Sequence, residues 1–340
     1  MEEKDEGPKG FLEPVGPFEF SGTQFPPQVK IMKDHPAAEP VLAVSSSVWQ
    51  GFVGACDRNA SWLMPLPAMI VTVLLMVFPL LYLLYMSVHD WMLIGGKSPQ
   101  FVWFQNYWGL LRDERFLASL WRTAIFIILG LIVQIPLGLA IAVLFNEHFP
   151  GRGIMRTLLL LPMVATPVAM ALIWVIMMDP SQGVLNYFLS WFGIEGVAWL
   201  SDINLVIPAL ILVDTWQWTP MVALICLAGL SALPIEPFEA ALIDGANVWQ
   251  RFWRLTLPMV WPTLLIAILF RFIDLLKVIE HIYVMTRGGP GFSSETINLY
   301  NFLMGLFYYR VGYGSSISVV IFALVLGASL ILIRARRTSW

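Results

Sequence analysis

Three ionisable residues interrupt an apolar run near the end of the chain, LLIAILFRFIDLLK. They are Arg271, Asp274 and Lys277, and their spacing by three places them roughly on one face of a helix. Charged groups within an apolar segment mark either a functional site or a pair that neutralises itself inside a helix bundle. A guanidinium and a carboxylate can also hydrogen-bond a polar solute from the wall of a cavity. The residues themselves leave both interpretations open.

A second polar stretch, DTWQWTP, lies in an earlier apolar run. Its two indoles, Trp216 and Trp218, could offer flat apolar faces to the ring of a solute. Buried aromatic side chains more often pack against their neighbours, so bundle packing is the alternative.

No pattern typical of an enzyme active site is found. The only Gly-Lys-Ser is at 96–98, and Trp91 stands where a phosphate-binding loop needs a glycine. The cysteines, Cys56 and Cys226, form no disulfide or metal framework. The four histidines are scattered: His35, His89, His148 and His281. We therefore predict no catalytic residue, no metal site and no cofactor bound by this chain itself.

The composition indicates that lipid is the solvent of these segments. The chain is 58% hydrophobic and 13% charged, whereas a soluble domain carries about 25% charged residues. The net charge of −3 does not indicate a nucleic-acid partner. About 20 apolar residues cross a bilayer, and six segments qualify: 63–88, 120–145, 156–178, 203–230, 258–280 and 312–334. All six favour helices, so we predict an all-α membrane protein.

The first sixty residues have a different composition. Residues 1–60 are rich in Pro, Gly and mixed charge, without the pattern of a signal peptide, and favour a largely irregular tail. Residues 61–340 form the predicted membrane domain.

Basic residues suggest the orientation. With both termini in the cytoplasm, the short inner loops hold Arg152, Arg156, Arg251 and Arg254, whereas the outer loop 179–202 has no Lys or Arg. The positive-inside rule then favours cytoplasmic termini.

The inner loop between the fourth and fifth spans reads EAALIDGANVWQRFWRLTLP. We predict a short helix from Pro237 to Ile243, which Gly245 ends in the left-handed conformation. Asn247 then caps a second short helix, and Pro258 begins the next span. Such a loop is either a knob that inserts into a cytoplasmic partner or an interfacial connection.

The same loop resembles the signature of binding-protein-dependent ABC importer permeases. That signature is Glu-Ala-Ala, three residues, Gly, nine residues and Leu-x-Leu-Pro, which stands here from Glu239 to Pro258. Asp244 also matches the form common in sugar permeases. Segments 145–186, 282–296 and 311–320 are similar to parts of the maltose/glycerol-phosphate-type permeases, and the resemblance covers roughly residues 60–335.

The resemblance implies a type I ABC importer permease fold of six transmembrane helices with a cytoplasmic coupling helix, in a bacterial cytoplasmic (inner) membrane. The coupling residues carried over are Glu239, Ala240, Ala241, Asp244 and Gly245, and the substrate-pathway residues are Trp216, Trp218, Arg271 and Asp274. The implied partners are a second permease subunit in a heterodimer, two ATP-binding cassette subunits and an extracytoplasmic solute-binding protein. ATP and Mg would bind the ATPase subunits.

A sugar or oligosaccharide is the cargo that the resemblance implies. The alternatives are an anionic oligosaccharide of the uronate or alginate kind, glycerol phosphate, or an ATP-independent carrier or channel.

Overall fold

The structure is a computed structural model, and it describes residues 62, 64–96, 98–194 and 196–337. The predicted tail, residues 1–60, lies outside the described residues. The chain divides into two units, Met1–Ile70 and Val71–Trp340. The described part of the first unit contributes little more than the start of one helix, and all later elements belong to the second.

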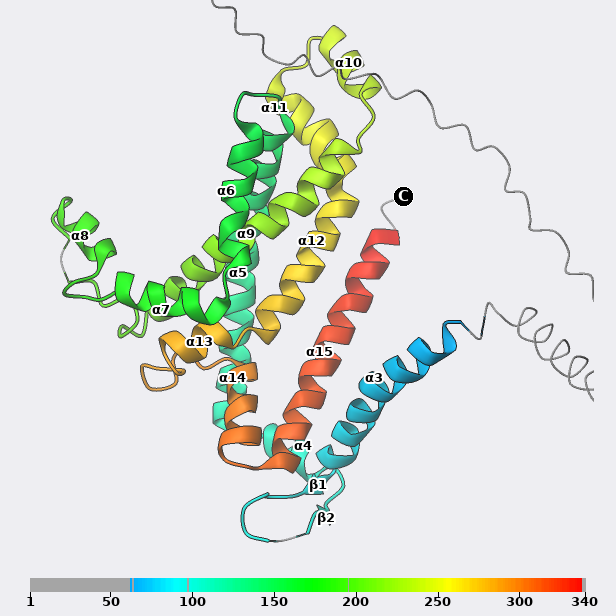
Figure 1. Cartoon of the computed structure of the whole chain (residues 1–340), viewed down its shortest axis with the longest axis vertical. Helices are drawn as coiled ribbons and strands as arrows, with labels where there is room; N and C mark the ends of the chain where they lie inside the picture. The colour runs from blue at the N-terminus through cyan, green and yellow to red at the C-terminus, as the bar shows by residue number, and fades with distance from the viewer. Residues whose placement is uncertain (1–61, 63, 97, 195, 338–340) are drawn as a thin grey trace, which may run out of the picture. The chain divides into compact units, whose positions relative to one another are not determined.

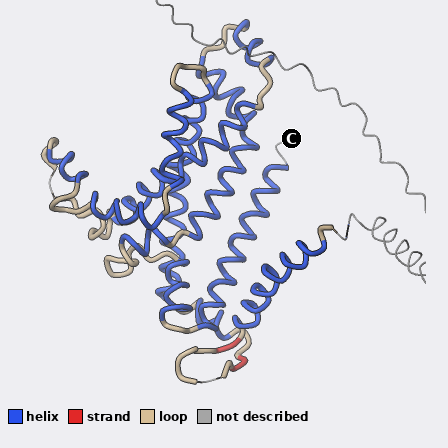
Figure 2. The backbone as a smooth tube through the Cα atoms, in the orientation of Figure 1, coloured by secondary structure: helices blue, strands red, loops and turns tan. Residues whose placement is uncertain are grey.

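The described chain is helical apart from one short hairpin, as the sequence predicted (Figures 1 and 2). In chain order its elements are α3 (Leu66–Ser87), β1 (His89–Asp90), β2 (Gln100–Phe101), α4 (Gln105–Leu110), α5 (Glu114–Asn146), α6 (Arg152–Val164), α7 (Pro167–Met177), α8 (Val184–Ser190), α9 (Val206–Ser231), α10 (Glu236–Ile243), α11 (Val248–Arg251), the π-helical turn η1 (Phe252–Thr256), α12 (Leu257–Lys277), α13 (Glu280–Met285), α14 (Ile297–Phe302), the π-helical turn η2 (Leu303–Phe307) and α15 (Val311–Arg337). The strands β1 and β2 pair antiparallel.

Within the described residues, five helical segments are long and apolar enough to cross a membrane. They are Leu66–Ser87, Glu114–Asn146, Val206–Ser231, Val248–Met285 and Val311–Arg334. A bent pair of shorter helices, α6 and α7, gives the sixth crossing if it counts as one span. The predicted number of spans is therefore reached only with a broken one.

The span predicted at 156–178 is broken into two helices in the structure. The helix α6 ends at Val164 and α7 begins at Pro167, with a bend of 94° between them. Ala165 and Thr166 are extended, with ψ of 144° and 134°. A proline disfavours the helical conformation in the residue before it and has no N–H to donate, so Pro167 favours the start of a new helix at this position.

The centre of the bundle is formed by α5, α9 and α12. In its most apolar window α9 is 67% buried, whereas α3 is 6% buried. Helices in lipid approach closely where small residues meet. A Cβ added at Gly138 of α5 would lie 2.5 Å from Cγ1 of Val222 in α9, so this crossing requires glycine.

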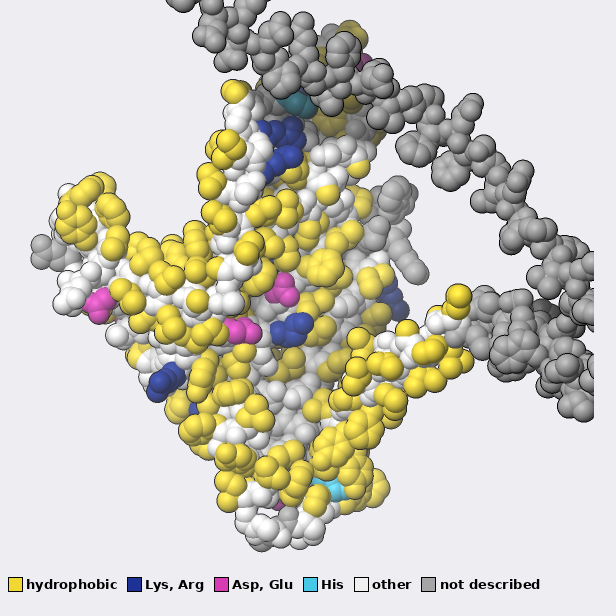
Figure 3. All heavy atoms as spheres, in the orientation of Figure 1, with side chains coloured by type: hydrophobic (Ala, Val, Ile, Leu, Met, Phe, Trp, Pro, Cys, Tyr) yellow, Lys and Arg dark blue, Asp and Glu magenta, His cyan; other side chains and the backbone are white. Residues whose placement is uncertain are grey.

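The face shown in Figure 3 is dominated by hydrophobic side chains, with few charged ones. Large apolar side chains along α3 are exposed, among them Leu75 and Met76 at 70% each. Such surface is costly in water and favourable in hydrocarbon, in agreement with a membrane-embedded bundle.

Pro258 lies in the first turn of α12, as predicted, although helical backbone already precedes it. Helical backbone runs from Val248 through η1 into α12 without a break. The N–H of Leu257 bonds the carbonyl of Phe252 in π geometry just before Pro258. The wider turn accommodates a residue that has no N–H for the regular ladder.

Candidate functional site

The helix α10 lies at the end of the bundle opposite β1 and β2 (Figure 1). Pro237 stands in its first turn, where a missing N–H costs nothing. At its end Gly245 has φ +73°, as predicted. The N–H of Ala246 donates to the carbonyl of Ala241 at 2.9 Å, and that of Gly245 to Leu242 at 3.1 Å. These two bonds form a Schellman motif, which fixes the end of the helix.

No residue of α10 is buried. Of the predicted coupling residues, Glu239, Ala240, Asp244 and Gly245 are exposed and Ala241 is half-buried. Ile243 in the same helix is 87% exposed. Ile235 and Leu242 are exposed as well, and several exposed apolar side chains close together mark a surface for contact with a protein or a membrane.

The second predicted helix of the loop begins as expected. The Asn247 side chain accepts a hydrogen bond from the N–H of Gln250 at 2.8 Å, and the Gln250 side chain accepts one from Asn247 at 2.9 Å. This reciprocal capping box satisfies two free donors. It starts the helix that continues into the membrane, so α10 is joined to α12 by only a short connection.

A buried ionic network lies among α5, α9 and α12. Arg271 is 1% exposed, and its Nη2 lies 2.5 Å from Oδ2 of Asp214. Its Nε donates to Oε1 of Gln134 at 2.7 Å, and Nε2 of Gln134 donates to Asp214 at 2.6 Å. The three side chains therefore close a ring of hydrogen bonds, one from each helix.

The sequence suggested Asp274 as the counter-ion of Arg271, and the structure adds a nearer one. Oδ2 of Asp274 lies 3.6 Å from Nη1 of Arg271, farther than Asp214, and its side chain is 42% exposed. Burial of Arg271 requires a close, hydrogen-bonded counter-charge, which only a residue from another helix supplies here. Asp274 and Lys277 keep exposed polar groups on the same helix.

The two predicted indoles have different surroundings. Trp216 is 42% exposed and meets Trp174 of α7 edge to face, with ring centroids 5.6 Å apart. Trp218 is half-buried, and the guanidinium of Arg271 lies 5.9 Å from its ring centroid. Only Trp218 is therefore brought next to the charged network. Whether these residues line a substrate pathway stays a prediction.

A polar pocket of about 460 Å³ was not identified from the sequence. It lies among the connection that follows α12, α14, η2 and the start of α15. Its polar lining is Asn298, Asn301, Ser315 and Ser318, and Phe302 adds an aromatic face. The signal available in the sequence was the pair of asparagines three residues apart, which share one face of a helix.

The asparagine amides of this pocket are held in place. Nδ2 of Asn301 donates to the Ser318 hydroxyl at 2.8 Å, and Nδ2 of Asn298 donates to the carbonyl of Lys277. No hydrogen bond to either side-chain carbonyl oxygen occurs within the described part of the chain. The side-chain carbonyl oxygens of two residues that line this pocket are therefore free to accept hydrogen bonds.

The side chain of Gln217 stabilises the break between α6 and α7. Nε2 of Gln217 donates to the carbonyl of Ala165 at 3.2 Å, and its Oε1 lies 2.7 Å from Nε2 of His281. The carbonyl freed by the break thus finds a partner in α9. Gln217 and His281 are both at most 1% exposed, so this joint is inside the bundle.

The end of the bundle away from α10 is held by a set of residues that we call the outer clasp: Asp113, Arg115, Glu295, Tyr300 and Tyr313. Asp113 caps α5 and accepts hydrogen bonds from Tyr300 at 2.5 Å and Tyr313 at 2.7 Å. Arg115 pairs with the buried Glu295 at 2.6 Å. Burial alone raises the pKa of Asp113, but the two hydroxyls and two backbone N–H groups together hold that pKa below its ordinary value.

Among residues 62, 64–96, 98–194 and 196–337, no three His, Cys, Asp or Glu side chains lie close enough together to hold a metal ion.

Comparisons with known proteins agree with this arrangement. A family profile described as "Binding-protein-dependent transport system inner membrane component" matches residues 134–336. The chain is 35% identical over 284 residues to the "Trehalose/maltose transport system permease protein MalF" of Thermococcus litoralis, covering 83% of this chain and 95% of that one. It is 33% identical over 292 residues to the "Sulfoquinovosyl glycerol transport system permease protein SmoG" of Agrobacterium fabrum, covering 86% and 94%.

The fold has a counterpart among solved structures. A chain of a bacterial alginate ABC transporter, solved in complex with an alginate pentasaccharide-bound periplasmic protein, superimposes with a TM-score of 0.74 at 24% identity. The match covers 84% of this chain and 97% of that one. The type I importer permease fold is thus present. This chain belongs to the binding-protein-dependent transport system inner membrane components, the permease subunits of ABC importers.

Proposed function

We propose that this permease carries a neutral sugar or short oligosaccharide. The observation that carries the proposal is the pocket lined by Asn298, Asn301, Ser315 and Ser318 beside Phe302. Amide and hydroxyl groups both donate to and accept from sugar hydroxyls. An aromatic face covers the apolar side of a sugar ring. The printed names of two relatives, for trehalose/maltose and for sulfoquinovosyl glycerol, support the same class of cargo.

The electrostatics support a neutral cargo over the anionic alternatives. Arg271 is the most deeply buried cation of the bundle, and Asp214 and Gln134 already occupy its guanidinium. Asp274 adds an exposed carboxylate close by. With Lys277, the two cations and the two carboxylates of this region sum to zero, so a uronate or a phosphate would find no excess of positive charge there.

We assign the coupling role to α10. Its exposed residues Glu239, Ala240 and Asp244 would dock on an ATPase subunit, which would hold ATP and Mg. The slim alanine pair lets a partner approach closely, and Gly245 ends the helix without a Cβ at the surface. We place the protein in the inner membrane of a bacterium, with α10 on the cytoplasmic side. An even number of spans then places both termini in the cytoplasm.

Transport then follows from alternating access. A second, unlike permease subunit would complete the pathway, and the segment 287–290 would meet a solute-binding protein at the other end. Closure of two ATPase subunits would move α10 and, through the continuous helix from Val248, α12. Driving such an equilibrium from 1:99 to 99:1 takes about 5.5 kcal/mol of differential binding.

The test is ATPase stimulation in the reconstituted importer. Binding protein loaded with neutral di- or trisaccharides should stimulate hydrolysis, whereas uronate oligomers and glycerol phosphate should not. Stimulation by the anions alone would overturn the proposed cargo.

The coupling role is tested separately by co-purification. Glu239→Lys should reduce recovery of the ATPase subunits with the permease. Asp90→Lys, which reverses an exposed charge in β1, is the matched control and should leave recovery unchanged. Full recovery with Glu239→Lys would contradict the docking of α10.

A further inference from the structure

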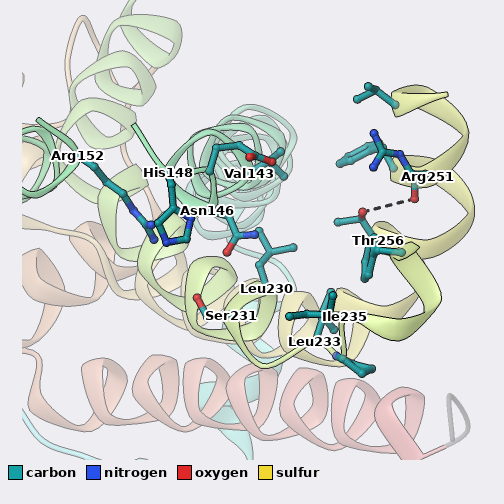
Figure 4. A pocket seen from close by; sticks show the side chains of 15 residues that line it. Val143, Asn146, His148, Arg152, Leu230, Ser231, Leu233, Ile235, Arg251 and Thr256 are labelled. Atoms are coloured by element: carbon teal, nitrogen blue, oxygen red, sulfur yellow. Dashed lines mark hydrogen bonds between the residues drawn. The ribbon is translucent and has the colours of Figure 1, made fainter. Parts of the chain in front are cut away.

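A cavity of about 600 Å³ lies behind α10, bounded by the end of α5, the start of α6, the end of α9, and α11 (Figure 4). It is level with the ends of two spans, since α5 ends at Asn146 and α6 begins at Arg152. Figure 4 shows Arg152 and His148 on one side of the cavity and Arg251 on the other, with Asn146 between them.

The two arginines that face this cavity have no counter-ion in the described residues. Neither Arg152 nor Arg251 forms an ion pair there, and the Nε of each is buried without a hydrogen-bond partner. Glu147 also lines the cavity, but it lies within bonding distance of neither guanidinium. Two partly buried cations with unused donors are costly unless a ligand satisfies them.

The rest of the lining is mostly apolar. Leu230 and Leu233 come from the end of α9, Ile235 and Phe238 from the α10 segment, and Phe252 from η1. A free inorganic anion would not use such a wall. An amphiphile with a phosphate head and a hydrocarbon part would satisfy both surfaces.

We propose that this cavity binds the phosphate group of an anionic amphiphile, with Arg152 and Arg251 as its two cationic contacts. Guanidinium groups bind phosphate oxygens through paired, charge-assisted hydrogen bonds. Basic pockets between helices at the level of the lipid head groups are suited to anionic lipids. A phospholipid and a soluble phosphate compound share this chemistry, and the experiment below separates them.

Occupancy would connect two separate parts of the chain. Arg152 belongs to α6, whereas Arg251, Ile235 and Phe238 belong to the loop that carries α10. A bound phosphate bridging the two arginines would brace this loop against α6. The inference concerns the coupling end of the bundle and does not depend on which sugar is carried.

The test uses the full chain, purified in a neutral detergent. Native mass spectrometry or Trp fluorescence follows titration with dihexanoyl phosphatidylglycerol, dihexanoyl phosphatidylcholine and inorganic phosphate. We expect saturable binding of phosphatidylglycerol, and at least tenfold weaker binding in Arg152→Gln and in Arg251→Gln. Arg254→Gln removes an exposed arginine next to the cavity that does not line it, and should bind like the parent.

The outcomes separate the sources of the ligand. Tighter binding of phosphatidylglycerol than of inorganic phosphate supports a lipid, and equal binding supports a soluble phosphate compound. Equal binding of the two lipids, or unchanged affinity in both arginine variants, overturns the proposal. Ser231→Phe, which fills the cavity without removing a charge, should also weaken binding, and its failure to do so would place the ligand elsewhere. None of these readouts requires transport, so failure of the sugar assignment would leave them unaffected.

Discussion

Arg271 and Asp214 come from different helices, α12 and α9, and meet at 2.5 Å inside the bundle with Gln134 bonded to both. The pair joins the helix that follows α10 to the central helix of the bundle. A buried pair of this kind is costly to break on one side only, because the other charge is left without a partner.

Neutralising one member of this pair should therefore destabilise the protein. We expect Arg271→Gln to cost about 3–5 kcal/mol, seen as a lower thermal unfolding midpoint of the purified chain. The double variant Arg271→Gln/Asp214→Asn leaves no unpaired charge and should recover much of the loss. If the double variant were no more stable than the single one, the pair would not be the cause. Arg254→Gln is the exposed control.

The two asparagines of the polar pocket should affect cargo binding more than folding. Asn298→Ala and Asn301→Ala each remove an acceptor worth about 0.5–1.5 kcal/mol. The KM for sugar-dependent ATPase activity of the reconstituted importer should rise about two- to tenfold in each. Asn204→Ala, outside the pocket, is the control. An unchanged KM in both pocket variants would remove this pocket from the pathway.

The end of α10 depends on a left-handed residue. Gly245 has φ +73° and open space around it. A side chain would therefore fit there, but a residue with a Cβ would be strained at this φ. A β-branched residue there costs about 1–2 kcal/mol and should shift α10. We expect Gly245→Val to lower coupled transport while basal ATP hydrolysis continues. Gly245→Asn tolerates the conformation and should transport better than the valine variant. Equal transport by the two would contradict this explanation.

The joint between the broken span and α13 depends on Gln217. Gln217→Leu leaves the carbonyl of Ala165 and the ring of His281 without their partner. Each stranded group should cost about 1–3 kcal/mol, measured as a lower unfolding midpoint. Gln182→Leu, at an exposed position, should have little effect. A Gln217→Leu variant as stable as the parent would show that these bonds contribute nothing.

The outer clasp should respond to acid. Because the folded-state pKa of Asp113 lies below its unfolded value of about 3.9, the stabilisation is fully present above that value. It is lost as the pH falls through the lower folded-state pKa. Asp113→Asn should lower the unfolding midpoint at pH 6. The difference between the unfolding midpoints at pH 6 and at pH 3 should therefore be smaller in this variant than in the parent. Asp90→Asn should leave that difference as in the parent. If Asp113→Asn showed the same pH dependence of the unfolding midpoint as the parent, the Asp113 carboxyl would not be the cause of that dependence.

The local features of the coupling loop were predictable from the sequence. The ends of these helices depend on residues close together in the sequence. They are a proline in the first turn, a glycine after the last turn, and Asn247 three residues before Gln250. The membrane-spanning segments could also be predicted from the sequence, because a run of about 20 apolar residues is long enough to cross a bilayer.

The contacts between residues far apart in the sequence could not be predicted in this way. Asp274 stood three residues from Arg271 and was the evident partner, yet Asp214, 57 residues away in the chain, lies closer. The 94° bend required more than Pro167, since Pro136 and Pro220 lie inside unbroken helices. A break forms where another helix satisfies the freed carbonyl, as Gln217 does for Ala165.

The sequence by itself thus determined the membrane class, the helical segments and the ends of α10, because these depend on composition and on contacts a few residues apart. Only the tertiary structure decided which charges pair, where the third span breaks and which side chains share a pocket. Those outcomes depend on how α5, α9 and α12 cross, and a crossing is determined by the shapes of two surfaces that the chain order does not bring together.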